Sequence, residues 1–181
     1  MNAESICVFC GAQNAVPKAH LEMGAKLGET IAKAKRKLVF GGGDCGVMGA
    51  VANAAMQANG FVTGVFPRSL RDLEKEHQRI SEIIMVDTMH ERKFIMYEKS
   101  DIFVIMPGGF GTMDELFEIL TWKQLKLHDK PIIIFNYLGY WDHLVALMDN
   151  IITTGFAREE NRLIYSVVND LDALLTELHI K

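Results

Sequence analysis

Short, almost wholly apolar runs that alternate with amphipathic segments constrain the fold of this chain more than any other feature. Each run is six or seven residues long and holds a stretch of about five with almost no polar alternation, which is typical of strands buried on both faces. The segments between the runs carry apolar residues at helical spacing, as at Leu27, Ile31 and Ala34. The runs are SICVFC (5–10), KLVFGG (37–42), FVTGVFP (61–67), SEIIMVD (81–87), DIFVIMP (101–107), KPIIIFN (130–136) and LIYSVV (163–168).

This alternation predicts an α/β fold, a doubly wound, mostly parallel sheet of about seven strands flanked by helices. The chain has 181 residues, enough to bury a core, and we expect residues 1–181 to form a single domain. In such sheets ligands bind beyond the carboxyl ends of the strands. The residues that follow each apolar run are therefore the candidates for a functional site.

The composition excludes several classes of protein. It is 49% hydrophobic and 23% charged, which is ordinary for a soluble globular protein. The net charge of -4 gives no general attraction to nucleic acid or to an anionic membrane. No apolar run approaches the ~20 residues that span a bilayer, and the first residues lack the pattern of a signal peptide. We expect no binding to nucleic acid or membrane, so a bound anion must be held by a local site.

The cysteines give little support to a metal or redox site. Cys7 and Cys10 form a C-x-x-C within an apolar run, and positions three apart on a strand face opposite sides. No second pair of ligands is available for zinc. We therefore expect unpaired, reduced thiols and a cytoplasmic location.

The first unusual strand end is VFGGGDCGVMG (39–49), where Gly41, Gly43 and Gly46 form a G-x-G-x-x-G between a predicted strand and helix. The dinucleotide-binding fingerprint also needs an acidic residue at the end of the next strand. That strand ends in GVFP (64–67), so a complete NAD site is disfavoured. Two interpretations remain open, namely close approach of the backbone to a ligand or another segment, and a tight turn with close helix packing.

The second strand end is DTMHERK (87–93). Thr88 and Glu91 have the spacing of a capping box, which gives Glu91 a structural role. Arg92 and Lys93 fall in or just after the first helical turn, where the helix dipole disfavours cations. They are either a solvated pair on an exposed helix face or part of an anion site. Their position after a strand favours the anion site.

The third strand end is MPGGFGTMDE (106–115). Pro107 ends the strand because it has no N–H to donate, and the glycines within 108–111 bare their backbone amides. Thr112 is a natural cap for the helix that follows. Free amides at a helix start bind anions, most often phosphate. The lysine of G-x-x-x-x-G-K-[ST] is missing, so one phosphate is favoured over hydrolysis of a nucleoside triphosphate.

Acidic residues follow this loop at once. Asp114, Glu115 and Glu118 would be stabilised by the helix dipole without any ligand, yet they would repel a phosphate. Thr112, Glu115 and Glu118 are spaced three apart along one helix face. A ligand with a phosphate at the helix start and a sugar further along would place its sugar beside Glu115, with the cations of 92–93 balancing the charge. This arrangement describes a nucleoside monophosphate.

The segment PGGFGTMDE (107–115) matches the P-G-G-x-G-T-x-x-E motif of the Lonely Guy family. These are the cytokinin riboside 5′-monophosphate phosphoribohydrolases, whose bacterial relatives were long labelled lysine decarboxylase-like. GGGDCGVMG (41–49), MHERK (89–93) and the segment 121–141 are also similar to the family's and occur in the same order. The resemblance therefore runs over nearly the whole chain.

The resemblance implies a Rossmann-like homodimer that hydrolyses the N-glycosidic bond of a nucleoside 5′-monophosphate. The substrate would be AMP or a cytokinin riboside monophosphate, and the products a free base and ribose 5-phosphate. We expect no cofactor and no metal ion. The helix FEILTWKQL (117–125) could contribute to a dimer contact, and an internal core explains its apolar residues equally well.

Residue by residue, Arg92 and Glu115 match the catalytic pair of the family. One position departs from it, since Cys10 and Gly11 are followed by Ala12 where the family often has serine. The predicted contacts with the substrate are Glu74, Met89, Lys93, Gly108, Gly109, Phe110, Gly111, Thr112, Glu118 and Thr121.

In this hypothesis Glu115 stabilises a positively charged, oxocarbenium-like ribose and orients or deprotonates water. Arg92 positions the substrate, because a guanidinium does not act as a proton donor near neutral pH. One rival is a non-catalytic nucleotide-binding or carrier protein on the same fold, although simple phosphate binding would not require a carboxylate. Decarboxylation would require a pyridoxal phosphate lysine, and Lys93 beside Arg92 is a poor candidate for it.

Overall fold

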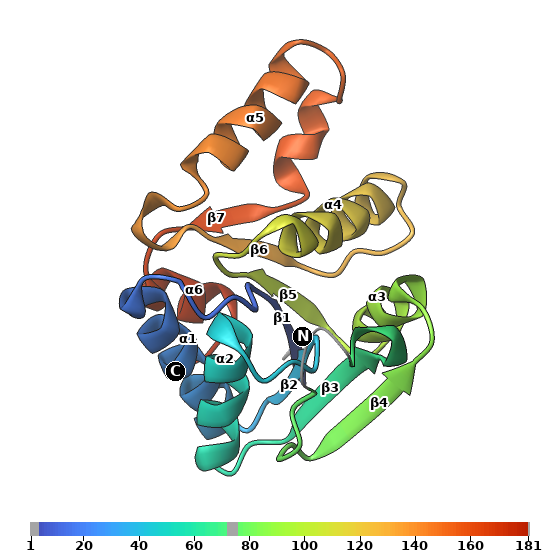
Figure 1. The fold of residues 1–181 in the computed structure, drawn as a ribbon. Helices are drawn as coiled ribbons and strands as arrows, with labels where there is room; N and C mark the ends of the chain where they lie inside the picture. The colour runs from blue at the N-terminus through green and yellow to red at the C-terminus, as the bar shows by residue number, and fades with distance from the viewer. Residues whose placement is uncertain (1–3, 72–75, 181) are drawn as a thin grey trace.

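The computed structural model describes residues 4–71 and 76–180, which form one seven-stranded parallel sheet covered by helices on both faces (Figure 1). The strand order is β4-β3-β2-β1-β5-β6-β7, and each neighbouring pair is parallel. The predicted fold class is confirmed, because each of the seven apolar runs supplies one strand. The strands are β1 (Ser5–Phe9), β2 (Lys37–Phe40), β3 (Val62–Pro67), β4 (Glu82–Val86), β5 (Ile102–Ile105), β6 (Ile132–Phe135) and β7 (Ser166–Val168).

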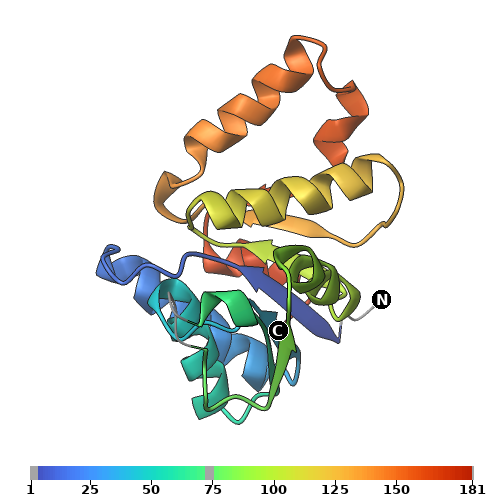
Figure 2. The same ribbon diagram turned by 45° about the vertical axis from the view of Figure 1, so that its right-hand side comes forward.

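The helices follow the strands in alternation. Within the described residues, 4–71 and 76–180, no helix is both long and apolar enough to cross a membrane. Helix α5 and the chain that returns through η3 extend away from the sheet beyond β7 (Figures 1 and 2). The helices are α1 (Lys18–Lys33), α2 (Gly46–Gln57), α3 (Met89–Glu98), α4 (Phe110–Gln124), α5 (Asp142–Thr153) and α6 (Leu171–Glu177), with short 3-10 turns η1 (Arg68–Leu70), η2 (Tyr137–Gly139) and η3 (Glu159–Leu163).

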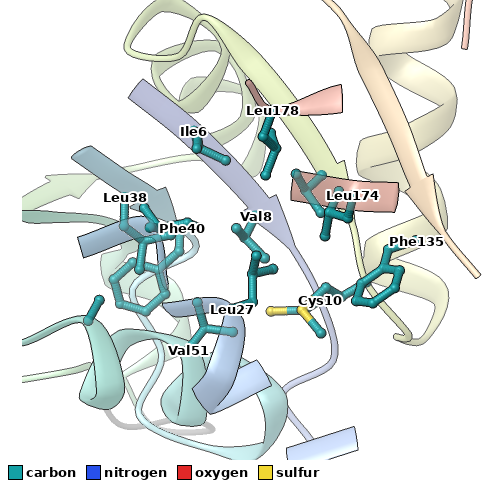
Figure 3. Close-up of a cluster of buried hydrophobic side chains, with 14 of the residues drawn as sticks. Ile6, Val8, Cys10, Leu27, Leu38, Phe40, Val51, Phe135, Leu174 and Leu178 are labelled. Carbon is teal, nitrogen blue, oxygen red and sulfur yellow. The ribbon is translucent and has the colours of Figure 1, made fainter. Parts of the chain in front are cut away.

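Each face of the sheet has its own apolar core, because side chains of a strand alternate between the faces. On one face Ile6 and Val8 pack with α1, α2 and α6 (Figure 3). On the other face Cys7 and Phe9 pack with α3, α4 and α5. Strands covered on both sides need no polar alternation, which explains the wholly apolar runs of the sequence.

Cys7 and Cys10 lie in opposite cores, as strand geometry predicts for positions three apart. Both are free thiols, and so is Cys45. Burial raises the pKa of the Cys7 and Cys10 thiols, which makes them poor nucleophiles. The prediction of unpaired cysteines is confirmed.

The strand order creates a crevice between β1 and β5. From β1 the chain builds outward to β4, and it then returns to the other side of β1 with β5. The loops that follow β1 and β5 lie side by side, and they then lead to α1 and to α4 (Figure 2). The amide of Gly11 donates to the carbonyl of Pro107 at 3.1 Å, and the amide of Met48 donates to the carbonyl of Gly11 at 3.1 Å. Ligands of doubly wound sheets bind at such a switch point.

Candidate active site

A cavity of about 720 Å³ lies at this switch point. Its walls come from the loops after β1 and β5 and from the first turns of α1, α2, α3 and α4. Segments far apart in the sequence meet here, because the carboxyl ends of parallel strands share one edge of the sheet. Residues 107–112, Arg92 and Glu115 all line this one cavity.

A capping box fixes the start of α3, as the sequence predicted. The hydroxyl of Thr88 accepts from the amide of Glu91 at 3.1 Å, and the carboxylate of Glu91 accepts from the amide of Thr88 at 3.2 Å. Arg92 follows in the next position and is only 7% exposed. Of the two interpretations of the 92–93 pair, the solvated surface pair is therefore wrong.

Two backbone carbonyls at the ends of neighbouring strands hold the guanidinium of Arg92. Its Nε donates to the carbonyl of Val65 at 3.2 Å, and its Nη2 donates to the carbonyl of Gly41 at 2.9 Å. A Cβ added at Gly41 would lie 1.8 Å from that Nη2. Glycine is required at position 41 because Arg92 crosses the backbone there, which identifies the close approach that the sequence had left open.

Helix α4 begins one turn earlier than the sequence suggested. Its N-cap is Gly109, so the prediction that Thr112 caps the helix is wrong. Thr112 lies within the first turn, buried against Gly108, where an added Cβ would be 2.1 Å from its hydroxyl. No side chain caps α4. The amides of the first turn are therefore available to an anion in the cavity.

Glu115 faces the cavity from the second turn of α4 and is 5% exposed. Its Oε1 lies 3.9 Å from Nη1 of Arg92, which is an ion pair but too long for a hydrogen bond. Burial raises the pKa of Glu115 to about 7, although the charge of Arg92 opposes that rise. Near neutral pH the group is thus present in both protonation states and can accept or return a proton.

Lys93 does not line this cavity and is 7% exposed. Its ammonium lies 3.0 Å from Oδ2 of Asp114 and 3.2 Å from Oε1 of Glu118. Burial works to lower the pKa of Lys93, but the two carboxylates outweigh it and raise the pKa overall, so the ammonium stays charged. Lys93 and Glu118, which were both predicted to contact the substrate, thus form an ion pair with each other in the structure.

The remaining predicted contacts lie in different places. Met89 and Phe110 both line the cavity, and Phe110 is 88% exposed. Thr121 lines a second, smaller cavity of about 190 Å³ between α4 and α5, and its hydroxyl donates to the carbonyl one turn earlier at 2.6 Å. Glu74 lies outside the described residues. The substrate roles of all these residues stay predictions.

His20 and Tyr140 are among the cavity residues that sequence reasoning did not name. The hydroxyl of Tyr140 donates to the carbonyl of Gly108 at 2.6 Å, which ties the glycine loop to the chain after β6. The ring of His20 is 8% exposed, and its buried Nδ1 has no hydrogen-bond partner among the described residues. Tyr140 lies in a segment already noted for its family likeness, whereas His20 carried no signal. Ala12 also lines the cavity, so the departure at that position falls within the site.

The cavity thus combines two kinds of chemistry. Uncapped amides of α4 lie at one part of it, and a buried carboxylate beside a fixed guanidinium lies at another. In residues 4–71 and 76–180 no group of three or more histidine, cysteine, aspartate or glutamate side chains could hold a metal ion. The arrangement fits a ligand that has an anionic end and a part where positive charge develops.

Known proteins resemble this chain in sequence and in fold. The family model described as "Possible lysine decarboxylase" matches residues 48–178. Cytokinin riboside 5′-monophosphate phosphoribohydrolase LOG5 of Arabidopsis thaliana is 36% identical over 173 residues, which cover 96% of this chain and 76% of that protein. The cytokinin riboside 5′-monophosphate phosphoribohydrolase of Rhodococcoides fascians is 36% identical over 176 residues, covering 97% and 89%.

Among solved structures, the molybdenum cofactor binding protein of Rippkaea orientalis matches with a TM-score of 0.72. The match covers 97% of this chain and 94% of that one, at 21% identity. The likeness concerns the fold, because unrelated functions share such folds.

Proposed function

This chain belongs to the Lonely Guy family of cytokinin riboside 5′-monophosphate phosphoribohydrolases, and we propose that it hydrolyses the N-glycosidic bond of a nucleoside 5′-monophosphate. The products are the free base and ribose 5-phosphate. One observation carries the proposal: a single cavity joins the uncapped start of α4 to the buried Arg92–Glu115 pair.

The 5′-phosphate binds at the start of α4. The amides of Phe110, Gly111 and Thr112 have no side-chain cap, and the positive end of the helix dipole favours an anion there. Added Cβ atoms at Gly109 and Gly111 would meet nothing within 4 Å, which leaves room for a ligand close to the backbone. The contacts predicted for residues 108–112 are consistent with this placement.

The bond to the base breaks beside Glu115. As the base leaves, positive charge develops on the ribose, and the carboxylate stabilises that charge. The base leaves with the electron pair of the broken C–N bond and takes up a proton from solvent. Water adds to the anomeric carbon, and Glu115 accepts a proton from it, for which a pKa of about 7 is suited. A guanidinium is not a proton donor in such a reaction, so the role of Arg92 is to hold the ribose or phosphate and to favour the charged form of Glu115.

Met89 and Phe110 offer apolar surface to the base at the same cavity. The roles of Glu74, Glu118 and Thr121 in substrate binding stay predictions.

A non-catalytic carrier on the same fold is the rival function, and a solved structure of similar fold is a molybdenum cofactor binding protein. The buried carboxylate favours the enzyme, because a site that only binds an anion is weakened by a negative group nearby.

The chain's own surface supports a homodimer. Phe156 and Leu163 are 89% and 85% exposed, and Phe156 borders the second cavity beside Phe117 of α4. A second copy would cover these apolar groups. We expect a dimer by size-exclusion chromatography with light scattering, and a monomer for Phe156→Glu.

The free thiols support a cytoplasmic location.

The test of the activity is incubation of the purified protein with AMP, with separation of the products by chromatography. Adenine and ribose 5-phosphate should appear together, and adenosine should be cleaved poorly because it lacks the phosphate. Binding of AMP without release of adenine would support the carrier instead. A panel of nucleoside monophosphates, with their nucleosides as controls, would then establish the preferred base.

A further inference from the structure

We infer that Lys93 is a positioning residue that ties α3 to α4 and thereby fixes the spacing between Arg92 and Glu115. The inference rests on the proposed function and deepens it. It assigns to Lys93 a role different from the contact with the substrate that the family resemblance predicts.

The geometry places this contact directly beside the reactive pair. Lys93 follows Arg92 on α3, and Asp114 precedes Glu115 on α4. The ammonium of Lys93 lies 3.1 Å and 3.0 Å from the two oxygens of Asp114 and 3.2 Å from Glu118, one turn further along α4. A shift of α4 relative to α3 would therefore stretch the ion pairs of Lys93 and change the distance between Arg92 and Glu115 together.

The reactive pair needs such support because its own contact is weak. Arg92 is held by carbonyls at β2 and β3, on the far side from α4. The carboxylate of Glu115 makes no side-chain hydrogen bond within the described part of the chain, and it lies 3.9 Å from Nη1 of Arg92. The place of Glu115 in the cavity thus depends on how α4 is held, and Lys93 holds α4 at the adjacent residue.

The ion pairs of Lys93 are shielded from water to different degrees. The side chains of Lys93 and Glu118 are 7% and 22% exposed, whereas Asp114 is 56% exposed, and none of the three lines the cavity. An ammonium that already has two carboxylate partners has less to offer a phosphate, and moving it toward the cavity would leave Asp114 and Glu118 without their cation.

Lys93 also balances charge around Glu115. Burial and the charges of Asp114 and Glu118 raise the pKa of Glu115, while Arg92 and Lys93 lower it. Removal of Lys93 leaves the two acids uncompensated, so Glu115 should keep its proton to a higher pH. Removal of both acids has the opposite sign.

The experiment compares Lys93→Met, Lys93→Arg and the matched control Lys99→Met in AMP hydrolysis. Lys99 directly follows the last residue of α3 and pairs with Glu82 of β4 at 3.8 Å, so the control removes an ion pair that does not involve α4. We expect Lys93→Met to lower kcat roughly tenfold or more, to leave KM nearly unchanged, and to move the acidic limb of kcat to higher pH. Lys93→Arg should restore part of kcat, and the control should match the wild type.

A raised KM with normal kcat would mean that Lys93 binds phosphate and would overturn the inference.

A second variant separates position from charge. Asp114→Asn with Glu118→Gln keeps the charge of Lys93 but removes its partners, so kcat should fall while the acidic limb moves to lower pH. Unchanged kcat in this double variant contradicts the inference, and the double variant also serves if Lys93→Met does not fold.

A readout without turnover distinguishes this inference from the proposed function. The carboxyl carbon of Glu115 can be followed by NMR from pH 5 to 9 in the wild type and in Lys93→Met. Absence of AMP cleavage by the wild type would refute the function alone, and the titration would still apply. The same Glu115 midpoint in both proteins would overturn the inference, whether or not AMP is cleaved.

Discussion

Two glycine-rich loops follow strands of this sheet, and they do opposite things. In the loop after β2, Gly41 makes room for a side chain of the protein itself, since an added Cβ there would collide with Arg92. In the loop after β5, added Cβ atoms at Gly109 and Gly111 meet open space, and the helix that follows has no side-chain cap. The first loop is filled by a cation of the chain, and the second is left open to an anion.

The difference shows that a glycine-rich turn at a strand end does not by itself mark a ligand site. Its glycines allow another group to come close to the backbone, and whether that group is a ligand or a side chain of the protein has to be read from the structure. Here the partner of the first loop is the guanidinium that faces Glu115, so this loop should act on the chemical step and thus on kcat. The second loop should act on binding of the phosphate and thus on KM.

The largest expected effect on kcat comes from substitution of Glu115. Glu115→Gln keeps the size of the side chain but removes the carboxylate that stabilises the developing positive charge. We expect kcat for AMP to fall about 10³-fold with little change in KM. Steady-state kinetics and a circular dichroism spectrum for folding would check this, and a fully active variant would refute the mechanism.

A matched pair of glycine substitutions tests the comparison of the loops directly. Gly41→Ala forces Arg92 to move, and we expect kcat to fall about 10²-fold, because small misplacements near the chemistry have effects of this order. Gly111→Ala adds the same methyl group where nothing lies within 4 Å of it, so kcat should be unchanged. Equal kcat values for the two variants would mean that the loops do not differ in the way described.

The pH dependence sharpens the role of Glu115. If its carboxylate is the active form, kcat should rise about tenfold per pH unit below its pKa of about 7 and level off above it. Stability should change in the opposite direction. The folded pKa is raised above the unfolded value of 4.5, so the folded state binds more protons and loses stability as pH rises from 4.5 to 7.

Glu115→Gln removes this penalty, and we expect it to be more stable than the wild type at pH 8 by up to about 3 kcal/mol. At pH 4 the two proteins should be similar. Urea unfolding at both pH values would measure the difference, and equal stability at pH 8 would mean that Glu115 has an ordinary pKa.

The smallest effect should come from a support of the second loop. Tyr140→Phe removes the hydroxyl that donates to the carbonyl of Gly108, which costs about 1 kcal/mol in a typical case. We expect KM for AMP to rise about threefold and kcat to stay the same. A change in kcat without a change in KM would contradict the division between the loops.

Local patterns in the sequence were sufficient for much of the fold and part of the site. The seven apolar runs predicted the seven strands, because full burial of a strand leaves a local mark in its composition. The capping box of Thr88 and Glu91 formed as predicted, since its partners are three residues apart. The glycine-rich loop of residues 108–112 lies at the cavity, and glycines before a helix are a local signal too, but its contacts with a substrate stay a prediction.

Contacts between distant elements were not readable in this way. Three such contacts join segments 21 to 51 residues apart. Lys93 pairs with Asp114 and Glu118, Tyr140 donates to Gly108, and Arg92 crosses over Gly41. Even the cap of α4 was misplaced by three residues, because Thr112 packs against Gly108 instead of standing outside the helix.

By itself the sequence determined that this chain forms a parallel α/β sheet, with a glycine-rich loop between β5 and the helix that follows it. Only the tertiary structure decided which cation faces Glu115 and which cation is committed elsewhere. Arg92 and Lys93 are neighbours with the same charge, but adjacent positions of a helix point about 100° apart. The packing of α3 against the sheet and against α4 therefore sends one of them to the cavity and the other to Asp114 and Glu118.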